Sequence, residues 1–236
     1  MLTPPFLQKK ILLKTLILSF TLAFPPLNHA RDNGVCSAQV LAEKTSTGYT
    51  WTLASRLGAL MVEAQKQFGV RDKNWTLLGV DFTKDQAPSI WYPFSGDDQK
   101  MIGILITQQA ASNEKEAIFQ LAHEVVHTLS PTGPHNSSLV FEEGLASHFS
   151  IHAPRKLGID ISPDYFASGK YRRAYQELEK LYAIYPDASE RIKKLRLDIY
   201  SFSDLDEVTF RKQFPQLSSS HVKTLLTRFD QWNPAS

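Results

Sequence analysis

The chain has 236 residues, of which 42% are hydrophobic and 21% charged, so it can bury the core of a medium-sized domain. Its 13 proline and 11 glycine residues are too few for a collagen-like or disordered chain. A cysteine count of 1 excludes an internal disulfide framework and a cysteine-rich zinc finger.

The formal net charge of +2 originates at the N-terminus. Residues 1–30 contain Lys9, Lys10 and Lys14 and no acidic residue, so removing these charges leaves −1 for residues 31–236. The basic stretches further along the chain alternate with acidic residues, as they do on solvated helix faces. The sequence therefore predicts no nucleic-acid partner.

The N-terminal segment has the parts of a secretory signal peptide. A basic start is followed by an apolar run, Ile11–Phe24, a double proline and a small residue, Ala30. As a helix the run would extend roughly 21 Å, short of the roughly 30 Å hydrocarbon core of a bilayer. We therefore expect residues 1–30 to be a cleaved signal and the protein to be exported, to the periplasm or outside the cell. The alternatives are an uncleaved membrane anchor formed by residues 11–24 and a buried helix.

The rest of the chain, 31–236, is predicted to form one α+β domain in which a small sheet with helices precedes an all-helical part. Apolar residues at helical spacing predict a helix over 51–68, and strand-like runs follow at 75–82 and 101–107. The aromatic segment between the two strands is predicted to be a loop. We expect its Trp91 to pack over the sheet, with a place above a substrate cleft as the alternative.

The next helix has a recognisable start. Asn113 can cap it and Glu116 can reach back to the cap, and the apolar stripe that follows predicts a helix over 113–129. A segment rich in proline and glycine ends this helix, and another is predicted over 138–151. Short turns then join the remaining predicted helices, which cover residues 164–184, 188–200, 205–213 and 219–231.

The helix over 113–129 contains the pattern His123-Glu124-Val125-Val126-His127. Residues four apart lie on one face of a helix, so both imidazoles can bind one metal ion. Glu124 lies about 100° round the helix from His123, where it can accept a proton from a metal-activated water. Two neutral imidazoles with a carboxylate favour zinc. The pattern predicts a catalytic zinc site, and the alternative is a set of polar residues on a solvated helix face.

A second helix follows and carries Glu143-Gly144-Leu145-Ala146. Together with the two-histidine helix, this segment resembles the gluzincins, the thermolysin-like and aminopeptidase-like zinc peptidases. The resemblance implies a zincin-like fold in which His123, His127 and Glu143 bind Zn²⁺. It also implies that Glu124 is the catalytic general base.

The resemblance has further implications outside the two helices. It implies that strand 101–107 is an edge strand that holds an extended peptide. Some family members have an Asp one turn after the ligand Glu that supports a histidine, whereas this chain has Ser147 there. The family's oxyanion-stabilising residue lies downstream, and the candidate is Tyr171, with Tyr165 and Tyr175 as alternatives.

Some polar residues near the motif have two interpretations. Glu142 precedes Glu143, and only one of these two carboxylates can face the metal. His148 and His152 are a second pair of histidines spaced four apart. We expect this pair to consist of packing or surface residues, with a weak second metal site as the alternative.

The sequence thus predicts an exported zinc peptidase that acts on peptides or proteins, with Glu124 as the general base for a metal-activated water. The alternative is a non-catalytic binding or scaffold protein of zincin shape, with structural or residual zinc. A membrane is expected as a partner only if the N-terminal segment stays attached.

Overall fold

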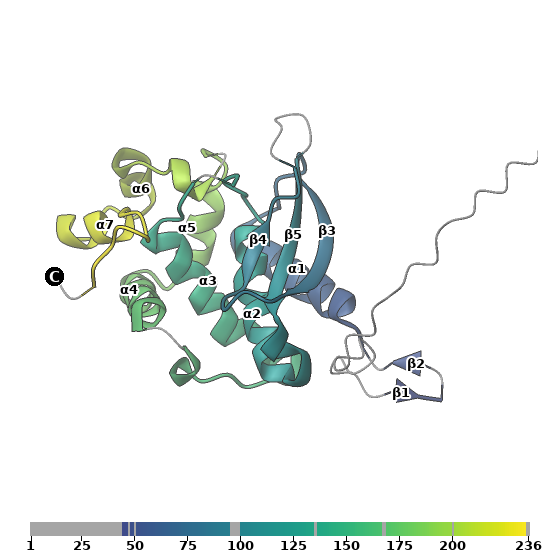
Figure 1. Cartoon of the computed structure of the whole chain (residues 1–236). Helices are drawn as coiled ribbons and strands as arrows, with labels where there is room; N and C mark the ends of the chain where they lie inside the picture. The colour runs from purple at the N-terminus through teal and green to yellow at the C-terminus, as the bar shows by residue number, and fades with distance from the viewer. Residues whose placement is uncertain are drawn as a thin grey trace, which may run out of the picture. The chain divides into compact units, whose positions relative to one another are not determined.

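Helices dominate the computed structural model, and a small mixed sheet accompanies them (Figure 1). The predicted signal peptide, 1–30, and the alternative anchor, 11–24, lie outside the described residues. Among the residues that are described, no helix combines the length and the apolar character needed to cross a bilayer. The structure describes most of one compact unit, 37–236, through residues 44–46, 48–49, 51–94, 100–134, 136–166, 169–199 and 201–234.

The sheet has the strand order β3-β5-β4. β3 (Thr76–Thr83) is parallel to the central strand β5 (Met101–Thr107), and β4 (Ser89–Trp91) pairs with β5 in the antiparallel orientation. β4 forms within the segment that the sequence predicts as a loop. The expectation that 101–107 is an edge strand is therefore wrong, because both sides of β5 are paired. The edge that borders the candidate site is β4.

Two helices pack against this sheet, one of them on β3 and the other, α2 (Glu114–His127), on β5 and β4. α1 (Leu53–Phe68) is confirmed where the periodicity predicts it, and it begins at Thr52, whose hydroxyl accepts a hydrogen bond from the Ser55 amide. The β5 side chains Ile104 and Ile106 are fully buried in the apolar cluster that α1 and α2 share. Burial of such an isoleucine contributes on the order of 1.5–3 kcal/mol, so this contact fixes the sheet against the helices.

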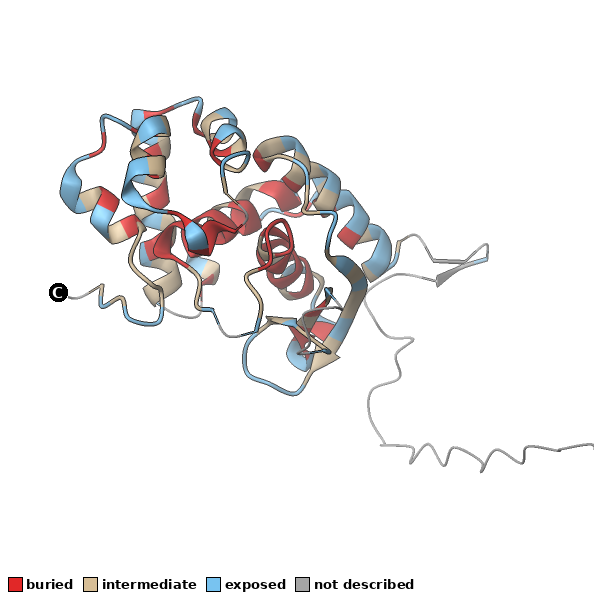
Figure 2. Cartoon of the chain, turned by 90° about the horizontal axis from the view of Figure 1, so that it is seen from above, coloured by how far each residue is buried: buried red, intermediate tan, exposed pale blue. Residues whose placement is uncertain are grey.

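The two helices that carry the sequence motifs are α2 and α3 (Val140–His152). α3 is almost entirely buried, and α2 is mostly buried after its first turn (Figure 2). Asn113 caps α2 as predicted, because its side-chain oxygen accepts a hydrogen bond from the Glu116 amide. The Glu116 carboxylate accepts a hydrogen bond from Gln120 (2.5 Å) instead of closing the predicted capping box. The helix that carries the histidine pair is thus held by its cap and by its burial.

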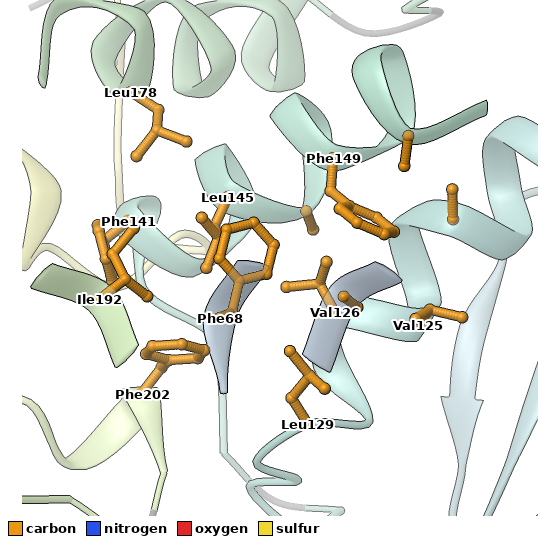
Figure 3. Packing of buried hydrophobic residues seen from close by; sticks show 14 of the residues in the cluster. Phe68, Val125, Val126, Leu129, Phe141, Leu145, Phe149, Leu178, Ile192 and Phe202 are labelled. Carbon is orange, nitrogen blue, oxygen red and sulfur yellow. The ribbon is translucent and has the colours of Figure 1, made fainter. Parts of the chain in front are cut away.

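Apolar side chains from helices throughout the described part of the chain meet in one core around α3 (Figure 3). Phe149 of α3 packs edge-to-face on Phe68 of α1, with ring centroids 5.8 Å apart. At the other end of α3, Phe141 packs on Phe202 at 5.7 Å. This core fixes α3 from both ends, and with it the carboxylates on its first turn.

In the described residues after α3 the regular elements are all helices, in agreement with the predicted α+β class. Each predicted C-terminal helix is present in shortened form, within the predicted bounds. The helices of this part are α4 (Gly169–Ile184), α5 (Ala188–Leu195), α6 (Glu207–Gln213) and α7 (Ser219–Leu225). The remaining short elements are β1 (Lys44–Thr45), β2 (Gly48–Tyr49), η2 (Gln108–Ser112), η3 (Ala153–Leu157), η4 (Pro163–Tyr165) and η5 (Phe202–Asp204).

Arg196, a half-buried residue after α5, makes hydrogen bonds to the segment that follows α2. The Arg196 guanidinium donates hydrogen bonds to the Leu129 carbonyl (2.8 Å) and the Ser130 hydroxyl. It also donates to the carbonyls of Phe68 and Gly69 at the end of α1. Burial lowers the pKa of Arg196 to about 10, so it remains charged at neutral pH and its donors stay available.

α3 and α4 approach each other closely at Gly144. A Cβ atom at this position would lie 2.7 Å from the carbonyl oxygen of Ala174 on α4 and 3.3 Å from Cβ of Leu178. The glycine of the Glu-Gly-x-Ala pattern therefore has a packing reason, because any side chain here would push α4 away from α3.

We expect Gly144→Ala to lower the free energy of unfolding by about 1–3 kcal/mol, because the added methyl group meets backbone that cannot yield easily. The matched control is Gly58→Ala on α1, where a Cβ meets nothing within 4 Å. That control should instead stabilise the protein, by about 0.5–1 kcal/mol. Urea denaturation of both variants checks this, and equal stability of the two would contradict the close contact.

Candidate metal centre

α2 brings two imidazoles together. His123 and His127 are one helical turn apart, and their Nε2 atoms are 3.3 Å apart. The His123 residue is 8% exposed, and the His127 side chain is 14% exposed. Two imidazole nitrogens that face each other at this distance, largely out of water, present two lone pairs to one point.

Glu143, in the first turn of α3, completes a triad with these histidines. Its Oε2 lies 3.1 Å from Nε2 of His123, and its Oε1 lies 3.6 Å from Nε2 of His127. Ligand atoms of a tetrahedral zinc ion are about 3.3–3.6 Å apart, because Zn–N and Zn–O bonds are about 2.0–2.2 Å long. The separation of the two imidazole nitrogens matches such an edge, and each of them lies near a different oxygen of the Glu143 carboxylate. With one ligand atom from each residue, the three atoms lie within 4.8 Å of one another, so the triad could hold a metal ion.

Two further side chains orient the triad. Nδ1 of His127 donates a hydrogen bond to Oε1 of Glu142 (2.8 Å), and Nε2 of the same ring faces the triad, where loss of its proton would free a lone pair for a metal ion. The Ser138 hydroxyl donates a hydrogen bond to Oε1 of Glu143. A histidine that binds a metal normally donates its other ring nitrogen to such a partner. Glu142 and Glu143 therefore both belong to the site, in different positions.

Ser147, one turn after Glu143, does not support the histidines. Its hydroxyl is buried and has no hydrogen-bond partner among the described residues, so it holds neither imidazole. The carboxylate that supports an imidazole is Glu142, from the preceding turn of α3. The sequence contains Glu142 as a candidate but gives no signal for this role, which depends on how α3 is rotated against α2.

The histidines and the carboxylates of the site shift each other's pKa values in opposite directions. Burial opposes the charged form of His127, but the carboxylates of Glu143 and Glu142 outweigh it and raise the pKa of His127 well above its usual value. Burial likewise opposes the charge on Glu143, yet His127 and His123 hold the pKa of that carboxyl well below its usual range. The site is therefore built to compensate buried negative charge with a cation.

Glu124 lies beside the triad and lines the same cleft. It is 4% exposed, and this burial raises the pKa of its carboxyl, an effect that His127 and His123 reduce and that Glu143 increases. A carboxylate with a raised pKa accepts and releases a proton more easily at neutral pH. The structure thus brings the predicted general base to the predicted ligands.

Tyr171, near the start of α4, also lines the cleft that contains the triad. Its ring packs edge-on against the ring of His123, with centroids 5.6 Å apart. Burial, followed by the charges of Glu143 and Glu124, raises the pKa of Tyr171 far above its usual value. The phenol therefore keeps its proton and can act as a hydrogen-bond donor.

The two alternative tyrosines lie elsewhere. Tyr165 packs edge-on against Phe119 (5.3 Å), and Tyr175 packs against Phe166 (5.7 Å). Neither tyrosine lines the cleft that contains the triad. Of the three candidates from the sequence, the structure brings only Tyr171 to the site.

The triad opens into a cleft of about 530 Å³. Trp91 of β4 forms part of its wall and is 47% exposed, while its ring also covers the backbone of Gly103 on β5. The hydroxyl of Tyr92 accepts a hydrogen bond from the Gly133 amide (3.2 Å), which fastens the loop after α2 to the end of β4. Trp91 therefore packs over the sheet, as expected, and it also borders the cleft.

We expect Glu142→Gln to weaken zinc binding about tenfold and Glu142→Ala up to about 100-fold, because His127 loses its charged hydrogen-bond partner. Competition with a zinc-sensitive dye measures this affinity. The matched control is Glu190→Gln on α5, whose carboxylate is exposed and pairs with Lys193. Zinc affinities that are unchanged in both Glu142 variants would show that Glu142 does not orient the ligand.

Comparison of this chain with protein-family models, with curated proteins and with solved structures gave no significant match. The function of this cleft is therefore inferred from the geometry of its residues and from the pattern His123–His127.

Proposed function

We propose that the protein is a zinc-dependent peptidase of gluzincin type. The observation that supports this most strongly is the buried group of His123, His127 and Glu143, with Glu124 beside it at one wall of a cleft. A structural zinc site would close its fourth position with a further protein ligand, whereas this triad borders a cleft. The zincin-like character of the fold is part of the same proposal.

The donor set favours zinc. Two imidazole nitrogens and one carboxylate are a common catalytic zinc set, and here these groups lie together at one wall of the cleft. His123, His127 and Glu143 would hold such an ion, and when bound it would supply Lewis-acid chemistry that lowers the pKa of a water molecule towards about 7.

Glu124 moves the proton in this proposal. Its carboxylate accepts a proton from the attacking water and then donates that proton to the nitrogen of the leaving amine. The raised pKa of Glu124, caused by burial, supports both steps, because a carboxyl that binds the proton too weakly could not hold it between them. Hydrolysis of a peptide bond is balanced by this one transferred proton and one water molecule.

Tyr171 stabilises the negative oxygen that develops on the substrate carbonyl. We expect Tyr171→Phe to lower kcat about 100-fold with little change in KM, because the lost donor acts mainly in the transition state. Steady-state kinetics on a fluorogenic peptide, with a zinc assay on the same sample, measures this. The matched control is Tyr165→Phe, which lies outside the cleft, and an equal effect of both variants would contradict the role of Tyr171.

An extended peptide is the substrate that fits the cleft. β4 is an edge strand on its wall, and an edge strand can hold a peptide through main-chain hydrogen bonds. The exposed ring of Trp91 offers an apolar surface for one substrate side chain. The basic and apolar N-terminal segment supports export of the protein, so we infer that its substrates are extracytoplasmic peptides or proteins.

Removal and replacement of the metal tests the proposal. The purified full chain should cleave unfolded protein chains, lose this activity with a zinc chelator, and regain it when about one equivalent of zinc is returned. Mg²⁺ should not restore the activity, since it prefers an octahedral set of oxygen ligands. Activity that persists after complete zinc removal would contradict the proposal.

A further inference from the structure

A second group of metal-ligating side chains lies between α3 and α4, outside the cleft. His148 and His152 are one turn apart near the end of α3, and their ring centroids are 4.3 Å apart. Glu179 of α4 faces both of them, with its Oε1 at 3.3 Å from Nε2 of His148 and 4.0 Å from Nε2 of His152. Two imidazoles and one carboxylate converge here, which is the donor set of the first site.

The imidazole nitrogens of this group are incompletely satisfied. Nε2 of His152 and Nδ1 of His148 are both buried and have no hydrogen-bond partner among the described residues. Leaving a buried polar atom without a partner is costly, so such atoms favour a ligand that completes them. For Nε2 of His152, which points to the same carboxylate oxygen as His148, a metal ion would be that ligand.

An aromatic ring holds one of these imidazoles in place. Tyr182 of α4 stacks on the ring of His148 with centroids 4.5 Å apart and an interplanar angle of 3°. This stacking restricts rotation of the His148 ring, whose Nε2 faces Glu179. The imidazole is therefore already oriented for a ligand shared with that carboxylate.

A nearby histidine–carboxylate pair shows the contrast. His221 of α7 lies 3.3 Å from Oε2 of Glu177, and the same ring nitrogen is 3.0 Å from the Glu177 carbonyl oxygen. This pair contains one imidazole, and its ring nitrogen has a hydrogen-bond partner on the protein. It is an ordinary helix–helix contact and provides a matched control on α4.

We propose that His148, His152 and Glu179 form a second binding site for a divalent transition-metal ion of the zinc type. The ion would connect α3 to α4, the helix that carries Tyr171. The 4.0 Å separation from His152 to Glu179 is wider than a tetrahedral edge, so the half-exposed Glu179 side chain moves inward on binding. This second site does not depend on the proposed peptidase activity.

Metal stoichiometry tests the second site on the full chain. Equilibrium dialysis against zinc, followed by elemental analysis, should give two equivalents for the wild type and one for Glu179→Gln or His152→Gln. Both changes affect side chains that are more than a third exposed, so the fold should tolerate them. We expect the affinity for the second equivalent to fall at least about tenfold, as on loss of any metal ligand or its support.

Two controls make the result specific. Glu177→Gln should keep both equivalents, because it alters a carboxylate on the same helix that faces a single imidazole. The double variant His123→Gln/His127→Gln should lose one equivalent and keep the one at the second site. With cobalt as the probe, the second site should add visible absorption that Glu179→Gln removes.

The second site is overturned if the wild type binds one equivalent and Glu179→Gln leaves that number and its affinity unchanged. It is also overturned if Glu177→Gln reduces binding as much as Glu179→Gln does, since that would indicate a general effect of charge. Absence of peptide hydrolysis would contradict the proposed function and leave this count of bound metal unaffected, so the two failures are distinguishable.

Discussion

Glu124→Gln should keep its zinc and lose its hydrolytic activity, by a factor of about 10²–10⁴ in kcat/KM. The variant has nearly the same shape as the wild type, so the burial of this side chain and the neighbouring ligands should be preserved. What it lacks is a group that can accept the proton of the attacking water. Kinetics on a fluorogenic peptide, with zinc measured on the same preparation, gives both quantities.

The control for this change is Glu114→Gln, on the first turn of the same helix. Its carboxylate is 40% exposed and pairs with Arg56, so the variant should retain nearly the full rate. A zinc-loaded Glu124→Gln protein that cleaves peptides at the rate of the wild type would contradict the role of Glu124. A Glu124→Gln protein that has lost its zinc would show instead that Glu124 belongs to the ligand set.

His127→Gln should abolish tight zinc binding at the triad and, with it, all hydrolysis. The change removes one of three ligands, takes from the buried carboxylate of Glu142 its imidazole partner, and leaves Glu143 with His123 alone. The zinc-dependent stabilisation should disappear as well. For the unmodified triad it amounts to about 2.7 kcal/mol when free zinc exceeds the dissociation constant 100-fold.

Thermal unfolding with and without zinc measures this effect, best in a Glu179→Gln background so that the second group does not contribute. His221→Gln is the matched control, because that imidazole faces one carboxylate on a different pair of helices. If zinc stabilises the His127→Gln variant as much as the wild type, the triad is not the zinc site.

Local signals in the sequence predicted most helices. α2 has a capping residue, Asn113, and a regular apolar stripe, and both features act within a few residues of the chain. β4 could not be predicted in this way. It has three residues in an aromatic, proline-containing segment, and it exists because it pairs with β5, a partner further along the chain. Strand pairing of this kind leaves little trace in a short segment.

The site residues, too, are predictable where their positions depend on local geometry and unpredictable where they depend on packing between helices. His123, Glu124 and His127 follow from one helical turn, whose geometry is fixed by the helix itself. The roles of Glu142 and Glu143 do not follow in this way, because neighbours on a helix point about 100° apart and the packing of α3 on α2 decides which one faces the triad. The sequence does not distinguish Tyr171 from Tyr165 and Tyr175. Only the packing of the helices shows which of them contacts His123.

Cleavage of a peptide library, read by mass spectrometry, is the measurement that tests the proposed peptidase most directly. The zinc-loaded wild type should produce new peptide termini, whereas zinc-loaded Glu124→Gln and the chelated wild type should produce none above background. A wild type that carries a full equivalent of zinc at the triad and produces no new termini would contradict the proposed peptidase activity. It would favour a non-catalytic binding protein.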